Sequence, residues 1–140
     1  MIEERQFLNF YPPTLDGKTV SDKKRFMLVI DVQKDSNIIR MLNVSSIKNR
    51  SVNLWYDCNI EIVNYYPLSM PTFAKLDTIY EIKYFKELEK FIAKGGNKLN
   101  YKEFRKILDE KTKYEKNNKT KKIEFTEKEF KKYNELKMQV

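Results

Sequence analysis

Two long apolar runs, separated by a short polar segment, constrain the fold of this chain more than any other feature. Residues 25–32 (RFMLVIDV) and 38–44 (IIRMLNV) are almost continuously apolar and rich in β-branched side chains, a pattern typical of strands buried on both faces. Residues 34–37 between them have the composition of a hairpin loop. The sequence therefore predicts an antiparallel strand pair inside a sheet that is covered on both sides.

Shorter runs around this pair predict further strands. Residues 7–11, 52–56, 60–65 and 74–82 are rich in aromatic and β-branched residues, and prolines or polar turn residues separate them. Short strands with a turn about every 8–12 residues are typical of a small barrel or sandwich, not of alternating strands and helices. We therefore expect residues 1–82 to form a compact β core.

The apolar spacing changes to that of helices after residue 82. Gly95 and Gly96 end a first predicted helix, and Asn100 with Glu103 forms the start of a second. Each helix has one apolar face. These faces consist of Phe85, Leu88, Phe91 and Ile92, and of Tyr101, Phe104, Ile107 and Leu108. Residues 83–113 therefore predict a helical hairpin packed on the β core.

Residues 114–140 predict a basic linker and a C-terminal helix. The segment 111–122 is almost wholly polar, which is typical of a mobile linker. Thr126 and Glu129 mark the start of a third helix, whose apolar stripe of Phe130, Tyr133 and Leu136 is thin. We expect this helix to dock weakly or to await a partner. The whole chain is then an α+β protein, a β core followed by a helical extension.

Composition excludes several classes of enzyme. The 140 residues contain no histidine, which rules out catalytic triads, histidine-ligated zinc and histidine-based ribonuclease mechanisms. The only glycines are Gly17, Gly95 and Gly96, so neither a phosphate-cradling loop nor a dinucleotide fingerprint is present. We therefore expect a protein that uses no metal and no cofactor.

The net positive charge is concentrated in residues 81–140. Residues 1–80 hold 10 Lys and Arg against 9 Asp and Glu, whereas residues 81–140 hold 18 against 11. This asymmetry favours a polyanionic partner such as nucleic acid, although a solvated lysine-rich helix surface is the alternative. The single cysteine, Cys58, and the absence of an apolar segment near the roughly 20 residues that span a bilayer predict a cytoplasmic protein with no membrane partner.

Cations and hydroxyls flank the open end of the predicted hairpin. Lys24 and Arg25 lead into the first strand, and Ser45 and Ser46 end the second. Neighbouring antiparallel strands place the start of one beside the end of the other, so these side chains should meet. Guanidinium, ammonium and hydroxyl groups bind phosphate oxygens and stabilise charge that develops on phosphorus. The alternative reading is a solvated turn with no function.

These motifs resemble those of the MazF, PemK and ToxN toxins. In that group a loop ends in a basic residue that opens an apolar strand, and the following strand ends in a Thr/Ser pair. The ToxN branch is the more similar, because there an aromatic follows the basic residue, as Phe26 does here, and a lysine follows the hydroxyl pair, as Lys48 does. Residues 76–80 (LDTIY) are similar to the family's late strand, and Asn43 departs from a frequent proline.

The resemblance implies a small SH3-like or PemK-like β-barrel over residues 1–82 and a toxin that cleaves single-stranded RNA without metal, by attack of the 2′-hydroxyl. It implies a cognate antitoxin, RNA or protein, and a homodimer or toxin–antitoxin assembly. The residues carried over as catalytic are Lys24, Arg25, Ser45 and Ser46. The candidate RNA-binding residues are Lys23, Lys48, Trp55, Tyr56 and Tyr80, the aromatic ones offering faces for base stacking or else belonging to the core.

The general base and the activity itself stay open in the sequence. A desolvated lysine, Asp16, Asp22 or bound water could accept the proton of the 2′-hydroxyl. One alternative function is a non-catalytic nucleic-acid-binding or inhibitory protein of a mobile element, with the basic tail as an electrostatic clamp. Another is a protein-interaction module whose third helix binds a partner.

Overall fold

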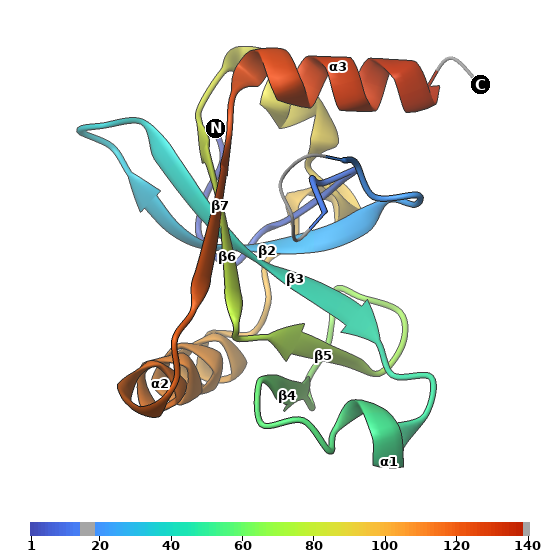
Figure 1. The fold of residues 1–140 in the computed structure, drawn as a ribbon, viewed down its shortest axis with the longest axis vertical. Coiled ribbons are helices and arrows are strands. Elements are labelled where there is room, and N and C mark those ends of the chain that lie inside the picture. The colour runs from blue at the N-terminus through green and yellow to red at the C-terminus, as the bar shows by residue number, and fades with distance from the viewer. Residues whose placement is uncertain (15–18, 139–140) are drawn as a thin grey trace.

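A computed structural model describes residues 1–14 and 19–138 of the chain, with 136–138 described by their backbone. Seven strands form one mostly antiparallel open sheet with helices at both ends (Figure 1). The strands are β1 (Phe7–Phe10), β2 (Arg25–Gln33), β3 (Ile38–Ser46), β4 (Asn59–Ile62), β5 (Thr72–Lys75), β6 (Thr78–Lys83) and β7 (Lys121–Phe125). The helices are α1 (Arg50–Asn53), α2 (Tyr101–Asn117), α3 (Glu127–Met138) and two short 3₁₀ helices, Lys86–Phe91 and Lys94–Gly96.

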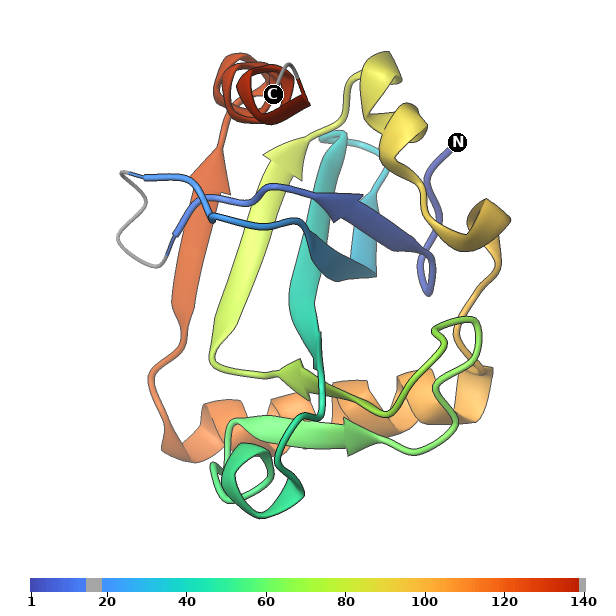
Figure 2. The ribbon, with the colours of Figure 1, turned by 90° about the vertical axis from the view of Figure 1, so that its right-hand side faces the viewer.

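The predicted hairpin, β2 and β3, is the centre of the sheet. β2 pairs antiparallel with β3 along its length, and β1 pairs with the outer edge of β2. The other edge of β3 is divided, because its first half pairs with β6 and its last residues pair with β5. β7 then adds to β6 in parallel, and β4 adds to β5 (Figure 2).

The sheet is open where the sequence predicted a closed barrel. In the described ranges, β1, β4 and β7 each pair with one neighbouring strand only. The division of β3 explains this arrangement, since the β6–β7 branch and the β5–β4 branch diverge from the same strand instead of continuing around a ring. A closed barrel is therefore not observed.

Alternation along β2 and β3 divides the core into two clusters. Met27 and Met41 enter one cluster, whereas Leu28 and Leu42 enter the other, and all four are fully buried. α3 and the first 3₁₀ helix cover the first cluster through Phe130 and Leu88; α2 covers the second through Phe104 and Ile107. The prediction that the two central strands are buried on both faces is confirmed.

Helix α3 is an integral part of the fold, which corrects the prediction of weak docking. Phe130 is 1% exposed, and its ring lies 5.0 Å from that of Phe10 and 4.8 Å from that of Phe91. The buried amide of Asn134 accepts a hydrogen bond from the Tyr11 backbone N–H at 2.8 Å. A single large aromatic and one buried amide therefore dock a helix whose apolar stripe is thin.

The predicted mobile linker is ordered. α2 continues through Asn117, so the expected boundary between residues 113 and 114 falls inside a helix, and β7 follows at Lys121. Ile123 and Phe125 are each 5% exposed, and their alternation places both in the first core cluster. These two apolar residues hold in the core a strand that also carries lysines. The polar composition of the segment therefore did not predict a strand here.

Other local predictions have mixed outcomes. Residues 52–56 are not a strand. Asn49 caps α1, and the Asn53 side chain accepts hydrogen bonds from the backbone N–H groups of Lys48 and Asn49. Residues 74–82 form parts of two strands that break at 76–77. The first predicted helix is a 3₁₀ turn, whereas Asn100 caps α2 as expected by accepting from the backbone N–H groups of Lys102 and Glu103.

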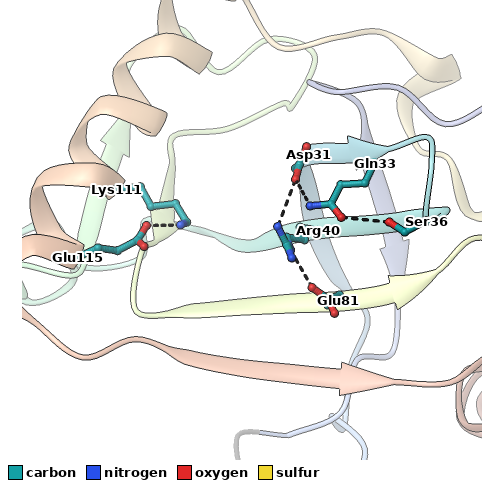
Figure 3. A network of polar contacts seen from close by, with 7 residues as sticks. All are labelled: Asp31, Gln33, Ser36, Arg40, Glu81, Lys111 and Glu115. Atoms are coloured by element: carbon teal, nitrogen blue, oxygen red, sulfur yellow. Dashed lines mark hydrogen bonds and ion pairs between the residues drawn. The ribbon is translucent and has the colours of Figure 1, made fainter.

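A polar network fixes the closed end of the hairpin. Arg40 on β3 donates from Nε to Glu81 on β6 at 2.7 Å and from Nη1 to Asp31 on β2 at 3.4 Å (Figure 3). These carboxylates raise the pKa of the Arg40 guanidinium, the hydrogen bond to Glu81 being the largest cause. One cation thus holds three neighbouring strands in register.

No helix in the described residues has the length and apolar content that crossing a bilayer requires.

Candidate functional site

The open end of the hairpin borders a pocket of about 430 Å³. We call it the hairpin pocket. Its lining includes all four predicted catalytic residues and two of the predicted RNA-binding residues: Lys23, Lys24, Arg25, Ser45, Ser46 and Lys48. The structure therefore brings together side chains that are about 20 residues apart in the sequence.

The register of the hairpin explains this juxtaposition. Phe26 is paired with Val44, which sets Arg25 across from Ser45 one position nearer the open end. The next residue outward on each strand faces the opposite side of the sheet. Because the pocket lies where the strands end, residues from both sides line it.

Backbone contacts hold the two segments that carry the cations and hydroxyls. Ser21 ties the loop before β2, since its N–H donates to the Pro12 carbonyl and its hydroxyl donates to the Lys23 carbonyl, both at 2.8 Å. After Ser46, the Ile47 N–H donates to the carbonyl of Pro71 at 2.9 Å. The pocket edge is thus fixed to β1 on one side and to the β4–β5 loop on the other.

The hairpin pocket is cationic. Its five basic residues are Lys23, Lys24, Arg25, Lys48 and Lys94, and no Asp or Glu is among its described lining residues. None of the five forms an ion pair with a carboxylate in the part of the chain that the structure describes. Uncompensated positive charge around a half-enclosed space of this size is suited to a phosphate or another small anion.

Lys94 is the site residue that sequence reasoning missed. It lies about 70 residues after Arg25 in the sequence, and its Nζ stands 5.4 Å from the centre of the Phe26 ring. Lys94 has a positive φ of 57° and precedes the two glycines that also have positive φ. Those glycines were visible in the sequence as a helix end, but nothing local indicated that this turn reaches β2.

The predicted base-stacking residues have different environments. Trp55 is 76% exposed and Tyr56 is 50% exposed, with ring centres 5.2 Å apart and an interplanar angle of 85°. They follow α1, whose Asn53 lines the hairpin pocket, but they do not line it themselves. Trp55 is therefore not a core residue. The exposed side chains of Val52, Tyr66 and Met70 come from the same part of the chain.

Tyr80, predicted as an RNA-binding residue with the core as the alternative, lies in the core. It is 4% exposed and belongs to the first core cluster. Burial raises the pKa of its hydroxyl, Asp77 raises it further and Arg25 opposes the shift. A ring face so enclosed cannot stack on a base from solvent, although Tyr80 also borders a second, smaller pocket.

The described residues supply no carboxylate base in the hairpin pocket. Asp22 is exposed and does not line it, and Asp16 lies outside the described residues. A pocket lysine or bound water then stays the candidate base. The described chain also contains no group of three or more His, Cys, Asp or Glu side chains able to hold a metal ion.

Comparison of the chain with protein-family models, with curated proteins and with solved structures found no match.

Proposed function

We propose that this protein is a metal-independent endoribonuclease of a toxin–antitoxin system that cleaves single-stranded RNA. The observation that carries the proposal is the hairpin pocket, in which five cations and the hydroxyl residues Ser45 and Ser46 surround one space without a carboxylate among the described lining residues. Such a set recognises a phosphate and favours an increase of negative charge on it.

The proposed step uses the substrate's own nucleophile. A base removes the proton of the ribose 2′-hydroxyl, the 2′-oxygen attacks the adjacent phosphorus, and the bond from phosphorus to the 5′-oxygen breaks. The 5′-oxygen takes up a proton, so the products are a 2′,3′-cyclic phosphate and a 5′-hydroxyl. No metal and no cofactor take part, and the protein supplies charge, orientation and proton transfer.

Each pocket residue has a role in this proposal. Arg25 binds two phosphate oxygens with its planar guanidinium, and Lys24 adds a point charge that can also protonate the leaving oxygen. Ser45 and Ser46 donate hydrogen bonds to the oxygens on which charge develops. Lys23, Lys48 and Lys94 line the same pocket and attract the neighbouring phosphates.

The exposed aromatic pair extends this surface. Trp55 and Tyr56 follow the helix whose Asn53 lines the pocket, and both rings present area to solvent. Unpaired bases stack on such rings with little sequence preference, at about 1–3 kcal/mol per base. RNA bound by its phosphate in the pocket would place a neighbouring base here, which favours single-stranded over double-stranded RNA.

The proposal includes the partners and the family likeness that the sequence motifs imply. The toxin would act in the cytoplasm and be held inactive by a cognate antitoxin, RNA or protein, in an assembly that can include a toxin homodimer. The branched sheet would then be an opened relative of the SH3-like barrel of MazF, PemK and ToxN toxins.

One observation favours a second function. The described lining of the hairpin pocket has no carboxylate and the chain has no histidine, so a carboxylate or imidazole base is absent from that lining. A protein that binds a nucleic-acid phosphate there without cleaving it, such as an inhibitory protein of a mobile element, would need only the cations.

Induced expression in a bacterial host separates the two functions. Wild-type protein should stop growth, and Arg25→Ala and Ser46→Ala should each restore it, because each removes a contact to the scissile phosphate. The matched controls are Arg105→Ala on α2 and Ser36→Ala in the β2–β3 turn, both exposed and outside the hairpin pocket. Toxicity that survives Arg25→Ala and Ser46→Ala, or growth unaffected by the wild type, contradicts the nuclease.

A further inference from the structure

A further pocket of about 450 Å³ adjoins the hairpin pocket at the start of β2. We call it the Lys90 pocket. Lys24, Phe26 and Lys94 line both pockets, so the two spaces share one border, and two of its three side chains are cationic. The remaining described lining comes from β1, from the end of the first 3₁₀ helix and from the residues after it: Asn9, Lys90, Phe91, Ile92 and Ala93.

Main-chain contacts hold in place the segment that carries Lys90 and Lys94. The Ala93 N–H donates to the carbonyl of Phe7 on β1 at 2.8 Å, and the residue before it forms an antiparallel bridge with the same strand. The two lysines stand on either side of this attachment in the sequence. Because β1 pairs with β2, the backbone of both lysines is fixed beside the start of the hairpin.

The Lys90 pocket carries uncompensated positive charge. No Asp or Glu is among its described lining residues, and its three lysines form no ion pair with a carboxylate in the ranges that the structure describes. The two carboxylates that precede Lys90 in the sequence have other partners. Glu87 lies 3.9 Å from the Nζ of Lys131, and Glu89 contacts the Tyr84 hydroxyl. Lys90 thus adds a sixth cation to the five of the hairpin pocket.

Two adjoining cationic pockets are suited to a ligand that carries negative charge at regular intervals. A single phosphate occupies one of the two spaces, whereas six neighbouring cations repel one another until their charge is offset. Single-stranded RNA carries one phosphate per nucleotide. The partly exposed rings of Phe26 and Phe91 add apolar surface beside the cations, against which a sugar or a base can pack.

We propose that the Lys90 pocket binds a second phosphate of the RNA strand, and that Lys94, at the border, lies between this phosphate and the one held by Arg25. This inference rests on the proposed function, since it takes the ligand of the hairpin pocket to be RNA. The hairpin pocket also reaches α1 through Asn53, which does not line the Lys90 pocket. The strand therefore runs from the aromatic pair after α1, through the hairpin pocket and past Phe26 to Lys90.

RNA that cannot be cleaved tests the Lys90 pocket apart from catalysis. Oligouridylates with 2′-fluoro sugars lack the attacking hydroxyl, and the probes are a dinucleotide with one phosphate and a pentanucleotide with four. Lys90→Gln should weaken binding of the pentanucleotide about two- to fivefold, the usual effect of one exposed ion pair, and reduce the slope of log affinity against log salt by about 0.7. Binding of the dinucleotide should be unchanged, because its phosphate occupies the hairpin pocket.

Two variants and one further probe serve as controls. Lys86→Gln removes the same charge from the same 3₁₀ helix at an exposed position outside both pockets, and it should leave affinity and slope unchanged. Lys90→Arg keeps the charge and should bind the pentanucleotide as the wild type does. An acetylated and amidated tetraglutamate peptide carries the same four negative charges, and it should bind about tenfold more weakly than the pentanucleotide because it offers no bases to the exposed rings.

Three results overturn the phosphate subsite. They are equal losses in Lys90→Gln and Lys86→Gln, a loss as large for the dinucleotide as for the pentanucleotide, and binding of the peptide at the affinity of the pentanucleotide or more tightly. The nuclease is judged separately, by cleavage of ordinary RNA and its dependence on Arg25. RNA that stays intact while Lys90→Gln weakens the pentanucleotide alone contradicts the nuclease and supports the subsite.

Discussion

Single residues decide both the site and the docking of the C-terminal helix. Asn134 is 1% exposed and bonds to the backbone of Tyr11, 123 residues away. Asn134→Ala should lower the free energy of unfolding by about 1–3 kcal/mol, because it removes a buried side chain and the acceptor of the hydrogen bond from the Tyr11 N–H. Urea denaturation measures this change. Glu135→Ala, at the neighbouring exposed position, should change stability by no more than about 0.5 kcal/mol.

Tyr80 makes stability depend on alkaline pH. Its folded-state pKa is raised above the ordinary value of about 10, mainly by burial. The unfolded chain then ionises first, so the contribution of Tyr80 is fully present below pH about 10 and is lost as the pH rises through the folded-state pKa. Urea midpoints at pH about 8 and about 10.5 should differ more for the wild type than for Tyr80→Phe.

The exposed Tyr56 is the control for this pH dependence. Tyr56→Phe removes a tyrosine hydroxyl from a half-exposed position and controls for the substitution itself. An equal loss in the wild type and Tyr80→Phe would contradict the assignment of the alkaline step to the buried hydroxyl.

At the level of residues, the sequence predicts those contacts between site residues that the register of the β2–β3 hairpin determines by itself. Arg25 and Ser45 meet because the strand register follows from two apolar runs and one short turn. Lys94 and Asp77 approach the same region through contacts made by distant turns, and local patterns carry no information on those contacts.

Among the elements, β7 and α3 contradict the expectation of an appended tail. Phe130 has four aromatic neighbours, and all of them belong to earlier elements or to β7. Phe130→Ala should lower the free energy of unfolding by about 3–5 kcal/mol, the usual effect of emptying a large buried site. Thermal and urea unfolding check this value, and Lys132→Ala on the exposed side of α3 should leave it nearly unchanged.

Elements with a strong apolar pattern could be predicted from the sequence. Elements that depend on local side-chain hydrogen bonds or on tertiary pairing could not. β2, β3 and the start of α2 follow from apolar runs and an asparagine cap. The short helix α1 replaces a predicted strand, because Asn49 and Asn53 satisfy backbone N–H groups locally. The strand β7 depends on pairing with β6 in parallel, which is a tertiary contact that its own polar residues do not indicate.

For the whole molecule, RNA binding through the hairpin pocket should depend on salt concentration in a specific way. Plotted as log affinity against log salt concentration, the slope for single strands changes by about 0.7 for each phosphate contact. Lys24→Gln in the hairpin pocket should reduce the slope by about that amount. Lys132→Gln removes the same charge from an exposed position on α3 and should leave the slope unchanged. Equal effects of the two substitutions would indicate a diffuse attraction to net charge.

The fold class and the meeting of the cationic and hydroxyl residues at the open end of the hairpin, but not the architecture of the sheet, could be predicted at this scale. Strand spacing indicated a β core with helices after it, yet it could not show that β3 divides its outer edge between β5 and β6. Removing the residues after 113 would delete β7 and α3 together with buried side chains, so charge substitutions test the basic tail and truncation does not.

The chemistry of the RNA ends tests the proposed ribonuclease activity most directly. Purified protein is incubated with single-stranded RNA in excess chelator, and the products are analysed for their termini. The proposed mechanism yields 2′,3′-cyclic phosphate and 5′-hydroxyl ends, absent with RNA that carries a 2′-fluoro group at the cleaved position and reduced at least about a hundredfold in Arg25→Ala. Intact RNA, or cleavage that leaves 5′-phosphate ends, would contradict it.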